Sequence, residues 1–207
     1  KTQLGTGFRE LAADLRLVAL VHDRHRFTAA AYLYRQYDTP RTDQCPAPTA
    51  PLDNCLIYEQ QFRHLVYATY ENLHTATALD HIRVTLSWQQ QHERRRLDQP
   101  SLRARDRGQD DVDSLGLLAR AESPWLSRGP VALRLAFGGD AYLDLVRSQA
   151  SLSFTDTGDV IPRSRGQYLD GSRFLTSGLW TDGELHIGPS LVLRGGARVG
   201  LVRADAP

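Results

Sequence analysis

Apolar and polar residues alternate along eight segments of this chain. The segments cover residues 10–22, 26–37, 61–72, 80–93, 111–123, 131–146, 173–186 and 191–203. Successive side chains of a strand point to opposite faces of a sheet, so a period of two predicts β-strands. The sequence therefore predicts an all-β chain of about eight long strands.

The connections between these segments alternate in length. Short connections lie around residues 23–25, 72–79, 124–130 and 188–190, and long ones cover residues 38–60, 94–110 and 147–172. In an antiparallel up-and-down meander every second connection lies at the same end of the sheet. Tight turns at one end and large loops at the other are typical of outer-membrane β-barrels. We therefore expect this antiparallel meander to belong to a transmembrane β-barrel.

The alternation is clearest in residues 81–93. Ile82, Val84, Leu86 and Trp88 share one face, and polar residues such as Arg83 occupy the other. In a barrel the polar face would line a wet lumen and contact a plug. The charged residues expected there are Arg83, Arg120, Glu122, Arg134, Arg194 and Arg198. The segments 27–37 and 62–71 carry bulky residues on both faces, so the pattern assigns them no register.

Alternation alone also suits a soluble β-sandwich, with its charges facing solvent. Several segments are 12 to 14 residues long, whereas strands of globular sheets are usually about 5–6 residues. This length favours the barrel. All ten prolines fall between the segments or at the end of the chain, as strands of either architecture require. The aromatic residues expected at the membrane interfaces are Phe27, Tyr37, Trp88, Trp125 and Tyr142.

Composition restricts the classes of protein further. The chain has 207 residues, 41% of them hydrophobic and 24% charged, and a net charge of +1. It contains no run of about 18 apolar residues, which a membrane helix would need. The charge does not favour a nucleic-acid partner. The chain has no methionine and opens in mid-pattern, so we expect a piece of a longer protein.

Six local motifs resemble the barrel of TonB-dependent outer-membrane receptors. They occur in order along residues 5–11, 34–43, 85–93, 111–116, 137–144 and 168–172, from Gly5-Thr6-Gly7-Phe8 to Tyr168-Leu169-Asp170-Gly171-Ser172. Each motif is weakly specific, and their common order along nearly the whole chain makes the resemblance.

The resemblance implies a 22-stranded barrel around an N-terminal plug, energised by TonB in the inner membrane of a Gram-negative bacterium. Residues 1–207 would then be a partial barrel domain from its middle, without the plug, the TonB-contacting segment or the remaining strands. The family implies a small-molecule cargo such as a ferric siderophore, haem, cobalamin or a glycan. Outer-membrane lipid would surround the barrel.

Two cysteines lie in the first long connection. Cys45 and Cys55 enclose nine residues, three of which are prolines. Such spacing in a loop suits a disulfide in an oxidising compartment. Closing so short a loop contributes on the order of 2–3 kcal/mol. A metal site would need closer pairs or nearby histidines, so we predict a disulfide.

The second long connection is rich in charge. Its arginines are Arg94, Arg95, Arg96, Arg103 and Arg105. Their planar side chains suit carboxylates, so the cluster could capture an anionic chelate or contact lipopolysaccharide phosphates. A solvated loop of mixed charge is the simpler interpretation.

No motif in the chain predicts an enzyme, a cofactor or a metal site. Gly5-Thr6-Gly7 lacks the third glycine of a dinucleotide loop. The seven histidines are scattered, and no serine lies in a nucleophile elbow. Asp111 and Asp113 share a strand face, but other oxygen ligands for calcium are missing from the pattern.

The sequence therefore predicts an outer-membrane receptor for active uptake of a scarce nutrient. Two alternatives stay open. One is a complete eight-stranded barrel that acts as an anchor or adhesin. The other is a soluble carbohydrate-binding β-sandwich, which would require two packed sheets.

Overall fold

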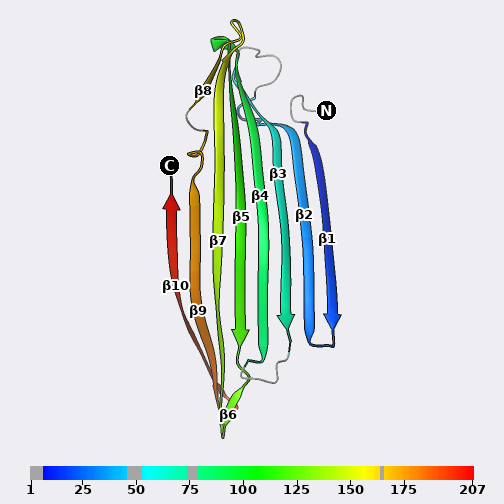
Figure 1. Ribbon diagram of the computed structural model, residues 1–207, viewed down its shortest axis with the longest axis vertical. Coiled ribbons are helices and arrows are strands. Elements are labelled where there is room, and N and C mark those ends of the chain that lie inside the picture. The colour runs from blue at the N-terminus through cyan, green and yellow to red at the C-terminus, as the bar shows by residue number, and fades with distance from the viewer. Residues whose placement is uncertain (1–6, 46–52, 74–78, 164–165) are drawn as a thin grey trace.

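The computed structural model describes residues 7–45, 53–73, 79–163 and 166–207, which form one antiparallel sheet of ten strands (Figure 1). The strands are β1 (Arg9–Val21), β2 (His25–Pro40), β3 (Cys55–Asn72), β4 (His81–Gln99), β5 (Ala104–Glu122), β6 (Leu126–Arg128), β7 (Val131–Phe154), β8 (Val160–Arg163), β9 (Arg173–Ile187) and β10 (Leu191–Asp205). Their order in the sheet is β1-β2-β3-β4-β5-β7-β9-β10, with the short strands β6 and β8 paired to β7. All eight predicted strands and the up-and-down order are confirmed.

The polarity of the connections is as predicted, and so are their lengths with one exception. The β1–β2, β3–β4, β5–β7 and β9–β10 connections lie at one end of the sheet, and the other three lie at the opposite end (Figure 1). The long loop predicted at residues 94–110 is wrong. There β4 continues to Gln99 and β5 begins at Ala104, so only a 3₁₀ turn, Pro100–Leu102, and Arg103 separate them. Ladder hydrogen bonds extend both strands after the apolar alternation has ended.

Two prolines lie inside paired strands, contrary to the prediction. Pro40 ends β2 opposite Ile57, and Pro162 lies in β8 opposite Ser151. Both are at positions where the sheet tolerates a missing donor, because one closes its strand and the other belongs to a four-residue edge strand.

Among the described residues, no helix is long and apolar enough to cross a membrane.

The strand register aligns residues of the eight long strands into rows across the sheet. One row is Leu17, Ala29, Ala68, Leu86, Leu117, Ala141, Ser177 and Leu201. Two residues along the strands, the next row on the same face is Ala19, Phe27, Tyr70, Val84, Ala119, Gly139, Leu179 and Val199. Neither row contains a charge. We call this side the apolar face.

The opposite side, here the polar face, has a different composition. The row between Val84 and Ile82 is Leu20, Arg26, Glu71, Arg83, Arg120, Gly138, Trp180 and Arg198. Five of its eight members are charged. The sheet therefore separates apolar from charged side chains across its own thickness.

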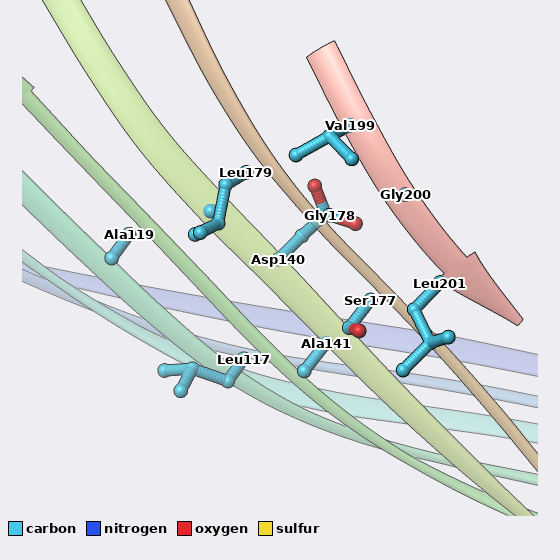
Figure 2. A pocket seen from close by; sticks show the side chains of 11 residues that line it. Leu117, Ala119, Asp140, Ala141, Ser177, Gly178, Leu179, Val199, Gly200 and Leu201 are labelled. Carbon is cyan, nitrogen blue, oxygen red and sulfur yellow. The ribbon is translucent and has the colours of Figure 1, made fainter.

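No second layer of protein covers the apolar face among the described residues. Leu86 is 59% exposed, Leu179 68% and Val199 69%. In the part of the chain that the structure describes, the buried apolar residues are only Ala30, Leu56, Ala104 and Ala136. A shallow hollow of about 670 Å³ crosses β5, β7, β9 and β10 on this face, where the small residues Ala141 and Ser177 lie between Leu117 and Leu201 (Figure 2). Exposed apolar area of this extent marks an interaction surface for protein or membrane.

The structure removes both alternative architectures. All ten described strands form a single sheet, whereas a β-sandwich requires two. The sheet order also ends at β1 and β10, which do not pair with each other in the described part of the chain. A closed eight-stranded barrel would require that pairing.

Large side chains of the polar face lie over glycines of the neighbouring strand. A Cβ added at Gly138 would approach Trp180 Cζ2 to 2.5 Å and also meet the Ala119 carbonyl oxygen. A Cβ at Gly178 would lie 2.5 Å from Arg198 Nη2. Glycine is thus required where Trp180 and Arg198 lie flat against the sheet.

We expect Gly138→Ala to lower the free energy of unfolding by about 1–3 kcal/mol, because the new methyl group overpacks against Trp180 and a backbone carbonyl. Gly200→Ala is the matched control, since its Cβ would meet only the Ser177 carbonyl oxygen at 3.5 Å. Urea unfolding in detergent measures both. Equal stability of the two variants would contradict the packing described.

Candidate functional site

The polar face carries the charged residues that the sequence singled out. The register places Arg83, Arg120, Glu122, Arg134, Arg194 and Arg198 all on this face. They share this face because residues two or four positions apart on one strand point to the same side of the sheet, and the register aligns these positions between strands. That this face lines a lumen stays a prediction.

Glu122 is the centre of one group of ion pairs. Its Oε1 accepts a hydrogen bond of 2.8 Å from Arg120 Nε, and Arg134 Nη2 contacts its Oε2. His81 Nδ1 lies 3.8 Å from Oε1. The Glu122 side chain is only 14% exposed, so its charge is shielded from water and depends on these partners.

Glu71, on β3, is the centre of a second group of ion pairs. Arg26 Nε donates to Glu71 Oε2 at 2.5 Å, and Arg83 Nε lies 3.7 Å from Oε1. His81 Nε2 is 3.9 Å from the same oxygen. Because His81 also contacts Glu122, the two groups form one network across β2, β3, β4, β5 and β7.

The network has a net positive charge. The four arginines Arg26, Arg83, Arg120 and Arg134 surround two glutamates, which leaves two uncompensated positive charges. Arg83 and Arg120 are cross-strand neighbours, and like charges in that position repel. Their carboxylate partners offset this repulsion. A polar face of this kind suits water or an anionic partner, not lipid.

The other two predicted residues form separate pairs toward the β10 edge. Arg194 Nε lies 2.9 Å from Glu184 Oε2, and Arg198 Nη1 lies 2.9 Å from Asp140 Oδ1. Both arginines are more than half exposed. Exposed pairs contribute only about 0–1 kcal/mol, so these residues are available for other contacts.

The sequence did not single out Arg26, Glu71 or His81. Arg26 precedes the segment 27–37 and Glu71 ends the segment 62–71, and in both segments bulky residues on both faces hide the register. The cross-strand pairing of Glu71 with both Arg26 and Arg83 defines the register that the sequence leaves open. A charged residue at the end of each of two segments was the available signal.

The arginines predicted for an external loop lie mostly on strands, which corrects that placement. Arg94, Arg95 and Arg96 belong to β4 and Arg105 to β5, and only Arg103 lies in the turn. Most of these arginines form ion pairs with carboxylates. The ion pairs are Arg94–Glu59 (3.0 Å), Arg96–Glu59 (2.8 Å), Arg96–Asp98 (2.9 Å), Arg105–Asp98 (2.5 Å) and Arg103–Asp156 (3.7 Å). The cluster is therefore a network of mixed charge.

The predicted disulfide between Cys45 and Cys55 is present. Beside it, Arg41 N donates to the Leu56 carbonyl at 2.9 Å, and Leu56 N donates to the Gln44 carbonyl at 2.8 Å. Arg41 also hydrogen-bonds Asp43, which holds the pKa of the Asp43 carboxyl below its ordinary value. The bridge and these bonds close the base of the β2–β3 connection.

Trp88 marks the boundary between apolar and polar residues on the apolar face. Its Nε1 donates to Asp113 Oδ1 at 3.1 Å, and Arg147 Nη2 donates to Asp113 Oδ2 at 2.9 Å. His92 Nδ1 lies 2.6 Å from Asp111 Oδ1. Asp111 and Asp113 are thus occupied by protein partners. Within the described ranges, no group of three or more His, Cys, Asp or Glu side chains is placed to hold a metal ion.

Three of the five aromatic residues named from the sequence lie on the apolar face. Phe27 and Trp88 belong to its rows, and Tyr37 lies beyond them toward the end with long connections. Tyr142 packs on the polar face over Gly116, so its assignment to an interface is wrong. Trp125 lies in the β5–β7 connection against His186, with ring centroids 4.8 Å apart.

Comparison with known proteins agrees with a barrel segment. No protein-family model and no curated protein sequence matches the chain. Among solved structures, the ferric citrate transporter FecA in its unliganded form is similar, with a TM-score of 0.69 at 14% sequence identity. The match covers 98% of this chain and 30% of that one. The chain thus spans less than a third of the transporter, and the likeness at this identity shows the fold.

We expect Glu122→Gln to destabilise the protein by roughly 1–3 kcal/mol, because Arg120 and Arg134 would lose their shielded counter-charge. Asp205→Asn is the control, since its pair with Arg203 is 68% and 53% exposed and is worth about 0–1 kcal/mol. Denaturant unfolding compares the two. A cost no larger for Glu122→Gln than for Asp205→Asn would contradict the proposed central role of Glu122.

Proposed function

We propose that this chain is part of the barrel of an outer-membrane receptor, which takes up a scarce nutrient with energy supplied through TonB. The observation that carries this proposal is the apolar face. Sixteen aligned positions across eight strands contain no charge, yet no protein layer covers them in the described part of the chain. Acyl chains are the partner that such a face requires.

The dimensions support a membrane. On β2, apolar-face positions from Phe27 to Leu33 are uninterrupted, between His25 and Arg35. Six residues of strand span about 20 Å, and the apolar band of outer-membrane barrels is about 25 Å tall. Trp88 is the last apolar position on this face of β4, before Gln90, and its indole N–H is directed to a carboxylate, as in an interfacial tryptophan.

The polar face supports a wet lumen and a protein plug. Backbone groups inside a membrane must be satisfied within the sheet, so the edges β1 and β10 require further strands of the barrel. The network of Glu71 and Glu122 then faces the lumen near the end with short connections, which in outer-membrane barrels is the periplasmic end. Its excess positive charge suits contacts with acidic groups of a plug.

Cargo, plug and TonB enter as parts of the same proposal. The likeness to a ferric citrate transporter, together with the motifs in the sequence, supports active uptake of a ferric siderophore, haem, cobalamin or a related molecule. The protein binds and transports without catalysis, in the outer membrane of a Gram-negative bacterium. External connections capture the cargo, and a plug rearrangement admits it.

A pair of adjacent leucines tests the membrane assignment. Leu117 lies in an apolar row, whereas Leu118 faces the other side beside Thr85 and Asp140. We expect Leu117→Arg to cost about 2–4 kcal/mol of folding stability in a bilayer, and Leu118→Arg to cost far less because it enters the polar face. Urea unfolding in lipid vesicles measures both. Equal costs would refute a lipid-facing apolar face.

Uptake tests the rest of the proposal. Cells that lack the gene are supplied with ferric citrate, haemin or cyanocobalamin as the limiting nutrient, with and without TonB. We expect loss of uptake of one of these nutrients, and an equal loss when TonB alone is removed. Uptake that continues without TonB, or that never depends on the gene for any of the three, would contradict the proposal.

A further inference from the structure

A small polar pocket lies at the opposite end of the polar face from the Glu122 network. It has a volume of about 200 Å³, and its walls come from β3, β4 and β5 and from the segment that follows β8. Its polar lining residues are Gln61, Arg63, Gln91, His92, Glu93, Asp110, Gln167 and Tyr168. It is therefore built by four elements that are distant in sequence.

The segment at residues 166–172 is fixed over the pocket by hydrogen bonds to β7. Tyr168 N donates to Ser148 Oγ at 3.2 Å, and Ser148 N donates to Asp170 Oδ1 at 2.9 Å. Gly171 N donates to the Val146 carbonyl at 3.0 Å. A Cβ at Gly166 would collide with Ser148 Oγ and lie 3.2 Å from Asp110 Oδ1. The backbone thus passes directly against the acidic side chain.

Asp110 is the unusual member of this pocket. The residue is 6% exposed, and its Oδ1 accepts a 2.5 Å hydrogen bond from Ser148 Oγ, whose residue is 1% exposed. Its Oδ2 is buried and has no hydrogen-bond partner. A buried carboxylate oxygen without a donor is costly. A ligand that supplies the donor would remove that cost.

A second carboxylate lies beside the first. Glu93 and Asp110 are cross-strand partners on the same face. Gln61 Nε2 donates to Glu93 Oε2 at 3.2 Å, and no ion pair within 4 Å joins either carboxylate to a cation in the described residues. Like charges opposite one another repel. Arg63 also lines the pocket, but the two carboxylates outnumber this one guanidinium, so the pocket favours a further positively charged group.

The remaining walls suit hydroxyl groups. The side-chain amides of Gln61, Gln91 and Gln167 can each donate and accept hydrogen bonds. Tyr168 at the rim is 53% exposed and offers an aromatic face and a hydroxyl. A metal ion would need further oxygen or nitrogen ligands, and no group of three or more His, Cys, Asp or Glu side chains in the described residues is placed to hold one.

We propose that this pocket binds a small hydroxylated molecule bearing a protonated amine, of the amino-sugar type. The ammonium group lies between the carboxylates of Glu93 and Asp110, while the amides hold the hydroxyl groups. As a subsite for cargo at the outer mouth of the barrel, this role rests on the proposed function. The binding itself depends only on the pocket.

Calorimetry on the detergent-purified protein with three probes tests the ligand class. Glucosamine carries the ammonium group, N-acetylglucosamine has the same ring without the charge, and glucose has neither. We expect glucosamine to bind at least tenfold more tightly than the two neutral sugars, and binding to weaken with salt. Equal binding of all three, or no binding of glucosamine, would overturn the proposal.

Substitutions locate the site. We expect Asp110→Asn and Glu93→Gln each to weaken glucosamine binding at least tenfold. Asp144→Asn is the control, because Asp144 lies on the same face outside the pocket and its loss should leave the affinity unchanged. Circular dichroism and thermal unfolding confirm that each variant is folded. Unchanged affinity in folded Asp110→Asn and Glu93→Gln would overturn the assignment, whereas the TonB experiment tests uptake independently.

Discussion

The structure depends on one constraint, which is that a single sheet must satisfy two different environments at once. The ladder pairs the backbone groups of neighbouring long strands from β1 to β10, so side chains alone decide what each face contacts. Because successive side chains point to opposite faces, a charged residue on the polar face is followed along the strand by an apolar residue on the apolar face. A register shift of one residue would expose Arg83 and Arg120 to the environment of Leu86 and Leu117.

The two faces of the sheet therefore have different roles. The apolar face holds no charge in its central rows and is suited to acyl chains. The polar face concentrates shielded ion pairs at the end with short connections and an unsatisfied carboxylate, Asp110, near the other end. Buried or shielded charges with several partners fix geometry more than they add stability. We infer that the first cluster orders the wall, whereas Asp110 is held ready for a ligand.

The sequence predicts the strands well because alternation is a local signal. Residues 81–93 show it without interruption, and β4 was placed correctly at its start. The signal ends where both faces become polar, so the extension of β4 through Arg94, Arg95 and Arg96 was interpreted as a loop. Ladder hydrogen bonds and pairs such as Arg96–Asp98 stabilise that extension, and neither leaves a periodic pattern.

The site was predictable only in part for a similar reason. Arg120 and Glu122 follow clear alternation, whereas Glu71 lies beside a segment whose register only pairing with β2 and β4 defines. The pocket at Asp110 needs residues 166–172 to cross β7, which no local pattern shows. The most direct test of the account uses nitroxide labels at single positions 83–88 of the protein in lipid vesicles. Labels at 84, 86 and 88 should be accessible to oxygen dissolved in lipid, and those at 83, 85 and 87 to a water-soluble nickel chelate. Loss of this alternation, or shielding of positions 84 and 86 from oxygen, would contradict it.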